Sequence, residues 1–399
     1  MIYLVSNNLE LFNLNEDIKM IGVEESIKLL TPLSIIGLDT ETSGLSPWSD
    51  RLLLVQLGCK EFQVVIDCNT IDITLYKSLL ESDRLFLGWN IKFDLQWFYK
   101  YGIIIKRVYD GFLAEKLLWL GYPTGIHSLS LKTAGETYCN IELDKSVRGK
   151  IIWSKTLTQD IIEYGANDVK YLEEIYNKQL EKLQEEDLLT AIDIENRFVI
   201  VLAYIEWCGV KIDKVKWKQK IESDNKKLEE IKKKCNQWII DNMPNSKYIT
   251  YDTQGNLFSD TPFNTDPIIT LNWESPKQMV ELFKSLGVKL INKDGKESTD
   301  AKVLKPQSDK CSLIPIFIEY KEASQVCKTF GEKFLNQINP ISNRLHASWH
   351  SVGTDTARVS CGSSSEESIN LLNIPSDALT RSCFIAEEGN AWISIDYSG

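Results

Sequence analysis

The stretch that most constrains this sequence is Ser34–Leu45, which reads SIIGLDTETSGL. It begins with apolar residues, as a buried strand does, and then presents two carboxylates, Asp39 and Glu41, two positions apart. Because the side chains of a strand alternate between its faces, both carboxylates point to one side, about 6.6–7 Å apart along the backbone, and Thr40 points to the other. We therefore expect a buried strand that ends at a functional site, since sites in α/β sheets lie at strand ends.

Composition predicts a soluble protein of two to three domains in a reducing compartment. The chain has 399 residues, of which 43% are hydrophobic, and its net charge is −11. No apolar run reaches the roughly 18 residues that span a bilayer, and the opening MIYLVSNN is too short and too polar for a signal peptide. The nine cysteines form no CxxC pair, which favours an intracellular protein without a membrane partner.

The first half of the chain alternates strand and helix patterns, which predicts an α/β domain. The apolar runs at residues 51–58 and 62–67 predict an antiparallel meander with the Asp39 strand. Further expected strands are residues 2–5 and 85–87, and further expected helices are residues 24–30, 73–80, a segment through Phe93, Trp97 and Tyr101, parts of 110–140, and 157–183 with Thr158 as its N-cap. Asn90 and Asp94 are four positions apart, so we expect them to share one helical face.

Acidic residues on three of these elements predict a metal site. Asp94 follows the strand at 85–87, and Tyr164 and Asp168 are one helical turn apart, so they share a face. Four carboxylates repel one another unless cations neutralise them, and hard oxygen ligands suit Mg²⁺ or Mn²⁺. Two such ions about 3.5–4 Å apart hold both the attacking and the leaving oxygen of a phosphodiester.

Three motifs, DTETSGL, NIKFD and YGAND, resemble in order and spacing the exonuclease motifs of the DEDD superfamily in its tyrosine branch. That superfamily includes the proofreading domains of family A DNA polymerases and ribonuclease D. The resemblance implies a ribonuclease H-like fold, a mixed sheet flanked by helices, and metal-dependent 3′–5′ exonuclease activity with two Mg²⁺ or Mn²⁺ ions. It implies catalytic and metal-binding roles for Asp39, Glu41, Asp94 and Asp168, and a water-orienting role for Tyr164.

The same resemblance implies contacts with DNA near the metal site. Leu45 matches the apolar wedge beside the terminal base, and Asn90 matches a contact to the primer strand. The alternative interpretation of Leu45 is a core residue, and both interpretations stay open at this point.

The second half resembles the thumb and the start of the palm of family A DNA polymerases. A helix is expected at 213–240, and the stretch 211–234, most of which lies in this helix, has ten lysines and five acids. Such a helix can bind duplex phosphates. We expect a loop with a hairpin at 243–272 and helices at 276–286 and 314–336. The motifs that carry the resemblance are EWCGVKID, NWESPKQMVELFKSLG, STDAKVL, TDTARVS, NLLNIP and ISIDYSG. They imply that Arg358, after an alanine where the family has glycine, contacts the primer–template minor groove, and that Asp396 is the metal-binding aspartate of polymerase motif A.

These observations predict an exonuclease domain at 1–190, a mainly helical thumb at 191–335 and an incomplete palm at 336–399 that ends in motif A. The sequence contains neither the fingers nor the second palm acid, and one palm carboxylate cannot build a two-metal site. We therefore expect a 3′–5′ exodeoxyribonuclease that proofreads in DNA replication and does not polymerise alone. Two interpretations stay open: the sequence is a fragment of a polymerase, or it is one product of a gene split at motif A, in which case a separate polypeptide carries the rest. The expected partners are single-stranded 3′ ends and primer–template duplex, in the cytoplasm of a bacterium or of a phage-infected host.

Two alternatives remain at this stage. A ribonuclease D-like RNA exonuclease is one, because LDKSVRGKIIW followed by YGAND resembles that group too. The other is a polymerase scaffold that binds DNA without cutting it.

Overall fold

The computed structural model describes residues 1–8, 16–123, 125–142, 157–251, 267–362, 369–393 and 395. The chain divides into two compact units, which we describe separately. Unit 1 comprises residues 1–211 and 339–374, and unit 2 comprises residues 212–338 and 375–399. The domain boundaries expected from the sequence stay predictions.

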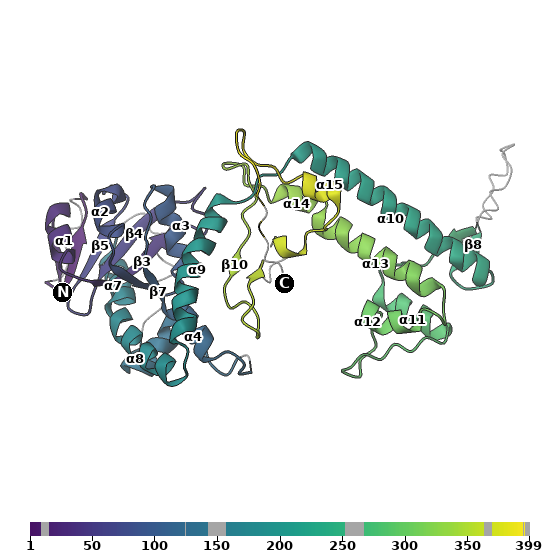
Figure 1. Cartoon of the computed structure of the whole chain (residues 1–399), viewed down its shortest axis with the longest axis horizontal. Helices are drawn as coiled ribbons and strands as arrows, with labels where there is room; N and C mark the ends of the chain where they lie inside the picture. The colour runs from purple at the N-terminus through teal and green to yellow at the C-terminus, as the bar shows by residue number, and fades with distance from the viewer. Residues whose placement is uncertain are drawn as a thin grey trace. The chain divides into compact units, whose positions relative to one another are not determined.

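Unit 1 contains a mixed sheet with the strand order β2-β1-β5-β4-β3-β6-β7 among the described residues (Figure 1). The strands are β1 (Ile2–Val5), β2 (Ile18–Met20), β3 (Ile35–Thr42), β4 (Leu52–Gly58), β5 (Gln63–Asp67), β6 (Leu85–Gly88) and β7 (Val108–Asp110). The expected antiparallel meander is confirmed, since β4 pairs antiparallel with both β3 and β5. The outer pairs, β3 with β6, β6 with β7, β1 with β5 and β1 with β2, are parallel.

Helices flank this sheet, which confirms the expected α/β fold. They are α1 (Val23–Leu30), α2 (Lys77–Leu80) after a 3-10 turn (Ile73–Tyr76), α3 (Lys92–Lys100), α4 (Gly111–Leu118), α5 (Leu131–Ala134), which continues as a π-helical turn (Gly135–Cys139), α7 (Gln159–Lys170), α8 (Leu172–Glu185) and α9 (Leu189–Cys208). Helix α7 packs across β3, β4 and β5 (Figure 1).

Several helix boundaries differ from the expected ones. The helix expected at 157–183 is two helices, α7 and α8, which are separated by a turn at Tyr171 (φ −106°, ψ −1°). Thr158 occupies the N-cap position, but its side chain makes no capping hydrogen bond. Asn90 and Asp94 do not share a helical face: Asn90 precedes α3 and has a φ of +60°, which a helix does not accommodate.

The return segment, residues 339–374, completes unit 1. It contains β10 (Trp349–His350), β11 (Ser360–Cys361) and a 3-10 turn (Leu371–Asn373). Leu345 forms an antiparallel bridge with Val210 just after α9, which anchors the start of the segment.

Unit 2 is mainly helical in the residues that the structure describes. Its elements are α10 (Lys214–Asn242), β8 (Ile249–Tyr251), β9 (Pro267–Ile269), α11 (Pro276–Ser285), α12 (Ala301–Leu304) with a 3-10 turn (Lys305–Gln307), α13 (Leu313–Phe330), α14 (Glu332–Asn336) and α15 (Ala378–Ser382). The expected hairpin is confirmed by the antiparallel pair β8–β9. The helix expected at 314–336 breaks at Gly331, whose backbone is extended.

The lysine-rich helix α10 buries the apolar side predicted from its spacing. Asp213 caps its N-terminus by accepting hydrogen bonds from the backbone of Val215 and Lys216, and Trp217 stacks on Phe334 with ring centroids 4.3 Å apart. Most of its lysines are exposed: Lys214, Lys216, Lys218, Lys226, Lys227, Lys233 and Lys234. In the described part of the chain, none of the helices combines the length and the apolar character needed to cross a membrane.

Candidate metal and nucleic-acid site

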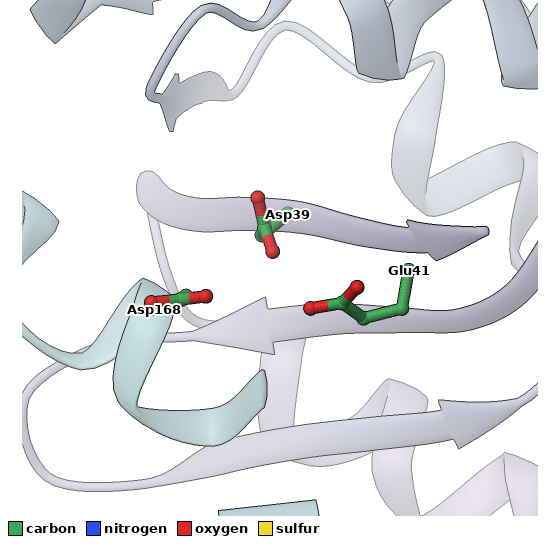
Figure 2. A group of neighbouring side chains, drawn as sticks. All are labelled: Asp39, Glu41 and Asp168. Atoms are coloured by element: carbon green, nitrogen blue, oxygen red, sulfur yellow. The ribbon is translucent and has the colours of Figure 1, made fainter. Parts of the chain in front are cut away.

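Three of the predicted acids lie together. Strand β3 presents Asp39 and Glu41 on one face, and α7 carries Asp168 over that face. Carboxylate oxygens of the three residues lie within 4.8 Å of one another. Figure 2 shows the three side chains directed toward a shared space between strand and helix. The two-residue period of a strand accounts for the pairing of Asp39 and Glu41, and the packing of α7 on β3 accounts for the position of Asp168 beside them.

Two glycines allow α7 to approach the sheet this closely. A Cβ on Gly37 of β3 would lie 2.7 Å from the backbone oxygen of Val169, which follows Asp168. A Cβ on Gly165 of α7 would lie 2.4 Å from the side-chain nitrogen of Gln56. The absence of these two methyl groups therefore sets the distance between Asp168 and the strand that carries its partner acids.

Asp94 lies outside this group of three acids. It is in the first turn of α3, it is buried, and its Oδ1 accepts a hydrogen bond of 2.5 Å from the hydroxyl of Thr40. Thr40 lies between Asp39 and Glu41 in β3, so its side chain points to the other face, as the sequence predicted. This orientation allows its hydroxyl to donate the hydrogen bond to Asp94. Burial, with smaller contributions from the carboxylates of Asp110 and Glu41, raises the pKa of Asp94 to about 8, against the effect of the Thr40 hydrogen bond. Its role as a fourth metal ligand stays a prediction.

Tyr164 and Leu45 differ sharply in exposure. Tyr164 is in α7 one turn before Asp168 and is buried in an apolar cluster with Ile161 and Ala166. Leu45 follows β3 and is 85% exposed, so the interpretation of Leu45 as a core residue is wrong. The apolar side chain of Leu45, four residues beyond Glu41, is thus open to solvent.

Asn90 is held by its backbone rather than by its side chain. Its N–H donates to Oδ1 of Asp110 at 2.8 Å, and the same oxygen accepts from the backbone of Phe112 at 3.0 Å. Burial raises the pKa of Asp110 to about 6, against the effect of these hydrogen bonds. Asn90 itself is exposed, and its backbone has a positive φ.

The predicted polymerase residues are only partly described. Arg358 is exposed and ends a loop closed by the hydrogen bond from the Gly353 N–H to the Arg358 oxygen, 2.8 Å long. Ala357 has a φ of +57°, a conformation that favours glycine, which accounts for the residue type that the family has there. Asp396 lies outside the described residues, as do the stretch LDKSVRGKIIW and residues 252–266 of the expected loop.

Sequence reasoning missed Gln56. It pairs directly across the sheet from Asp39 and is fully buried, and among the described residues neither its amide nitrogen nor its amide oxygen has a hydrogen-bond partner. A buried amide without partners is costly. The available signal was one polar residue inside the otherwise apolar strand LLLVQLG.

The three grouped acids fit a divalent cation. Like charges this close destabilise one another unless a cation or a proton intervenes. All the donors are hard carboxylate oxygens, a set that suits Mg²⁺ or Mn²⁺ and does not favour the softer metals that prefer sulfur or imidazole. The three histidines are engaged in other contacts: His127 with Glu115, His346 with Ser342 and the Glu206 oxygen, and His350 with the Gly362 oxygen.

Comparison with known families matches both halves of the chain. Residues 19–184 match the 3′–5′ exonuclease family model, and residues 264–399 match the family A DNA polymerase model. The chain is 27% identical to DNA polymerase I of Borreliella burgdorferi over 396 residues, which is 95% of this chain and 40% of that protein. It is 28% identical to DNA polymerase I of Aquifex aeolicus over 399 residues, 94% of this chain and 60% of that protein.

A solved structure shares the fold over most of the chain. The polymerase domain of Pol1 from M. smegmatis, in complex with DNA primer-template and dNTP, superimposes with a TM-score of 0.68 at 16% identity, covering 98% of this chain and 59% of that one. The chain thus spans about half the length of the relatives it matches.

Proposed function

We propose that this chain, which carries a 3′–5′ exonuclease domain and part of a family A DNA polymerase domain, removes nucleotides from DNA 3′ ends with divalent cations. The observation that carries the proposal is the group formed by Asp39, Glu41 and Asp168, whose oxygens lie within 4.8 Å of one another. With Asp94 as a fourth ligand, these residues would hold two Mg²⁺ or Mn²⁺ ions. Such ions make a water nucleophilic and stabilise the leaving oxygen of a phosphodiester.

The other residues of the site orient the reactants. The Tyr164 hydroxyl, one helical turn from Asp168, holds the attacking water in line with the phosphorus. The exposed side chain of Leu45 packs against the terminal base, and Asn90 contacts the strand that is being cut. Such positioning accounts for a large share of catalysis, because it removes the entropic cost of bringing the reactants together.

We further propose that the protein binds primer–template duplex as part of a replicative, proofreading polymerase. The exposed lysines of α10 would contact phosphates without sequence preference, and Arg358 would contact the minor groove. Such binding weakens steeply with salt, because each neutralised phosphate releases condensed counterions.

A double substitution tests the metal assignment. Asp39→Ala with Glu41→Ala removes two of the three grouped carboxylates, so we expect cleavage of a labelled single-stranded DNA to fall to background, as it does for the wild type in EDTA. The matched control is Glu24→Ala with Glu25→Ala, which removes two exposed acids of α1. Robust cleavage by the first variant would contradict the assignment.

The same assay decides the substrate class. We expect DNA to be shortened from its 3′ end faster than an RNA of equal sequence and labelling. Preference for RNA would favour the ribonuclease D-like alternative, and shortening of neither strand at any Mg²⁺ or Mn²⁺ concentration would favour the non-catalytic scaffold.

A further inference from the structure

A buried carboxylate in α9 joins two parts of unit 1 that are far apart in sequence. Oε1 of Glu206 accepts hydrogen bonds from the ammonium of Lys92 and from the backbone N–H of Trp349, the latter at 2.5 Å. Its Oε2 accepts from the side-chain amide of Gln96 at 2.6 Å. The Lys92 ammonium also donates to the Trp349 oxygen at 2.5 Å, which closes the network.

Burial makes this network a strong geometric constraint. The side chains of Lys92 and Glu206 are only 12% and 8% exposed, so little solvent can reach either charge. The backbone oxygen of Glu206 in addition contacts Nδ1 of His346 at 2.7 Å. A buried ion pair is sensitive to the removal of either partner, because the remaining charge stays uncompensated.

The helix held by this network is the one that carries Asp94. Lys92 and Gln96 flank Asp94 in α3, so they project on the side of the helix away from it. Asp94 is bound on its own side by Thr40 of β3. Helix α3 is thus fixed from two directions, by the strand that carries Asp39 and by Glu206.

A second contact joins the segment around Trp349 to α4. Lys116 of α4 donates to the Val352 oxygen at 3.2 Å. Lys116 also helps to line a cavity of about 20 Å³, together with Asn90, Asp110 and Ser351, which is enough for one water. The Ser351 hydroxyl is buried and has no hydrogen-bond partner among the described residues.

The residues that bind Glu206 belong to parts of the chain that match two different family models. Lys92 and Gln96 belong to the exonuclease match at 19–184, and Trp349 belongs to the polymerase match at 264–399. We propose that Glu206 is a positioning residue that couples the polymerase-matched segment around Trp349 to α3 and thereby sets the place of Asp94 in the exonuclease site. The inference rests on the function proposed above.

Glu206→Gln tests the coupling in the whole chain. It keeps the shape of the side chain and removes the charge, so the hold on Lys92 and Trp349 weakens. We expect hydrogen exchange of the α3 amides to rise at least tenfold while exchange in α7 stays unchanged. We also expect kcat for single-stranded DNA to fall by about 10- to 100-fold with KM nearly unchanged, since displaced catalytic groups act on the chemical step.

The matched control is Glu174→Gln, which weakens a more exposed ion pair of unit 1, between Lys60 and Glu174 (2.8 Å), and should change neither measurement. If Glu206→Gln does not fold, Gln96→Met removes one hydrogen bond without burying a charge, and we expect a smaller rise in α3 exchange together with a smaller loss of kcat. A variant that lowers the thermal midpoint but leaves α3 exchange and kcat at wild-type values would overturn the inference. If the wild type proves not to be a nuclease, the exchange measurement still decides the coupling.

Discussion

Adding one methyl group at Gly37 should separate the acids of the site without touching any of them. Gly37 is in β3 two residues before Asp39, directly under α7. The Cβ of Gly37→Ala would lie 2.7 Å from the backbone oxygen of Val169, 3.1 Å from its Cβ and 3.3 Å from the oxygen of Gly58. The first of these neighbours is backbone, so it cannot move aside by a rotamer change.

The size of the effect follows from these contacts. To reach an ordinary contact distance, α7 must retreat by about 0.3–0.7 Å, and forcing a methyl group into a packed interface costs about 1–3 kcal/mol. Asp168 precedes Val169 and moves with it, away from Asp39 and Glu41. Because a misplacement of about 1 Å can cost about 100-fold in rate, we expect cleavage of single-stranded DNA to slow by about 10- to 100-fold.

Binding of Mn²⁺ to the protein without DNA, followed by electron paramagnetic resonance, separates this geometric effect from unfolding. We expect Gly37→Ala to remain folded at 25 °C and to bind Mn²⁺ more weakly than the wild type. Gly22→Ala is the matched control, because its Cβ meets nothing within 4 Å. If Gly37→Ala binds Mn²⁺ and cleaves DNA like the wild type, the close approach of α7 to β3 does not set the site.

Three further predictions concern single side chains. Tyr164→Phe removes only a hydroxyl, so we expect cleavage to slow by about 10²–10⁴-fold with unchanged Mn²⁺ affinity; a wild-type rate would mean that Tyr164 only packs. Leu45→Ser changes an exposed residue, so we expect an unchanged thermal midpoint and a raised KM for single-stranded DNA in a steady-state assay; an unchanged KM would remove Leu45 from the substrate contact. The pKa of Asp110 rises from 3.8 to about 6 on folding, so the folded state binds the proton more tightly than the unfolded state does. The unfolding free energy of the wild type therefore falls by about 3 kcal/mol as the pH rises from about 4 to 6. In urea titrations in EDTA, Asp110→Asn, which keeps the Oδ1 acceptor, should lack that loss, and parallel pH profiles of the two proteins would contradict the pKa shift.

The arrangement of Asp39 and Glu41 could be predicted because it depends only on the two-residue period of a strand. Asp168 could be assigned to the same site through the order of the motifs, although no local sequence pattern predicts its distance from β3. That distance depends on Gly37, which in the sequence is simply one residue of an apolar run. The close packing of helix and strand is a tertiary property that composition and periodicity do not encode.

Errors of the sequence interpretation have equally local causes. The four-residue spacing of Asn90 and Asp94 indicated a shared face, but Asn90 precedes α3 with a positive φ, and its backbone N–H donates to Asp110 of β7. The apolar spacing of residues 157–183 continues through Tyr171 because α7 and α8 both bury one side, so periodicity alone could not reveal the break. Exposure of Leu45 could not be read from its residue type, since leucine is common in cores.

The discontinuous course of unit 1 has a consequence for its synthesis. Roughly 130 residues of unit 2 separate the end of α9 from the segment that returns to unit 1, and a ribosome adding about 5–20 residues per second needs about 6–25 s to make them. During that interval the sheet can form, but the hydrogen bonds of Lys92 and Glu206 with Trp349 cannot, because Trp349 lies 257 positions after Lys92. The nascent chain therefore carries an unfinished surface at α3, and a pause in translation between residues 212 and 338 would prolong the time for which chaperones or proteases can reach it.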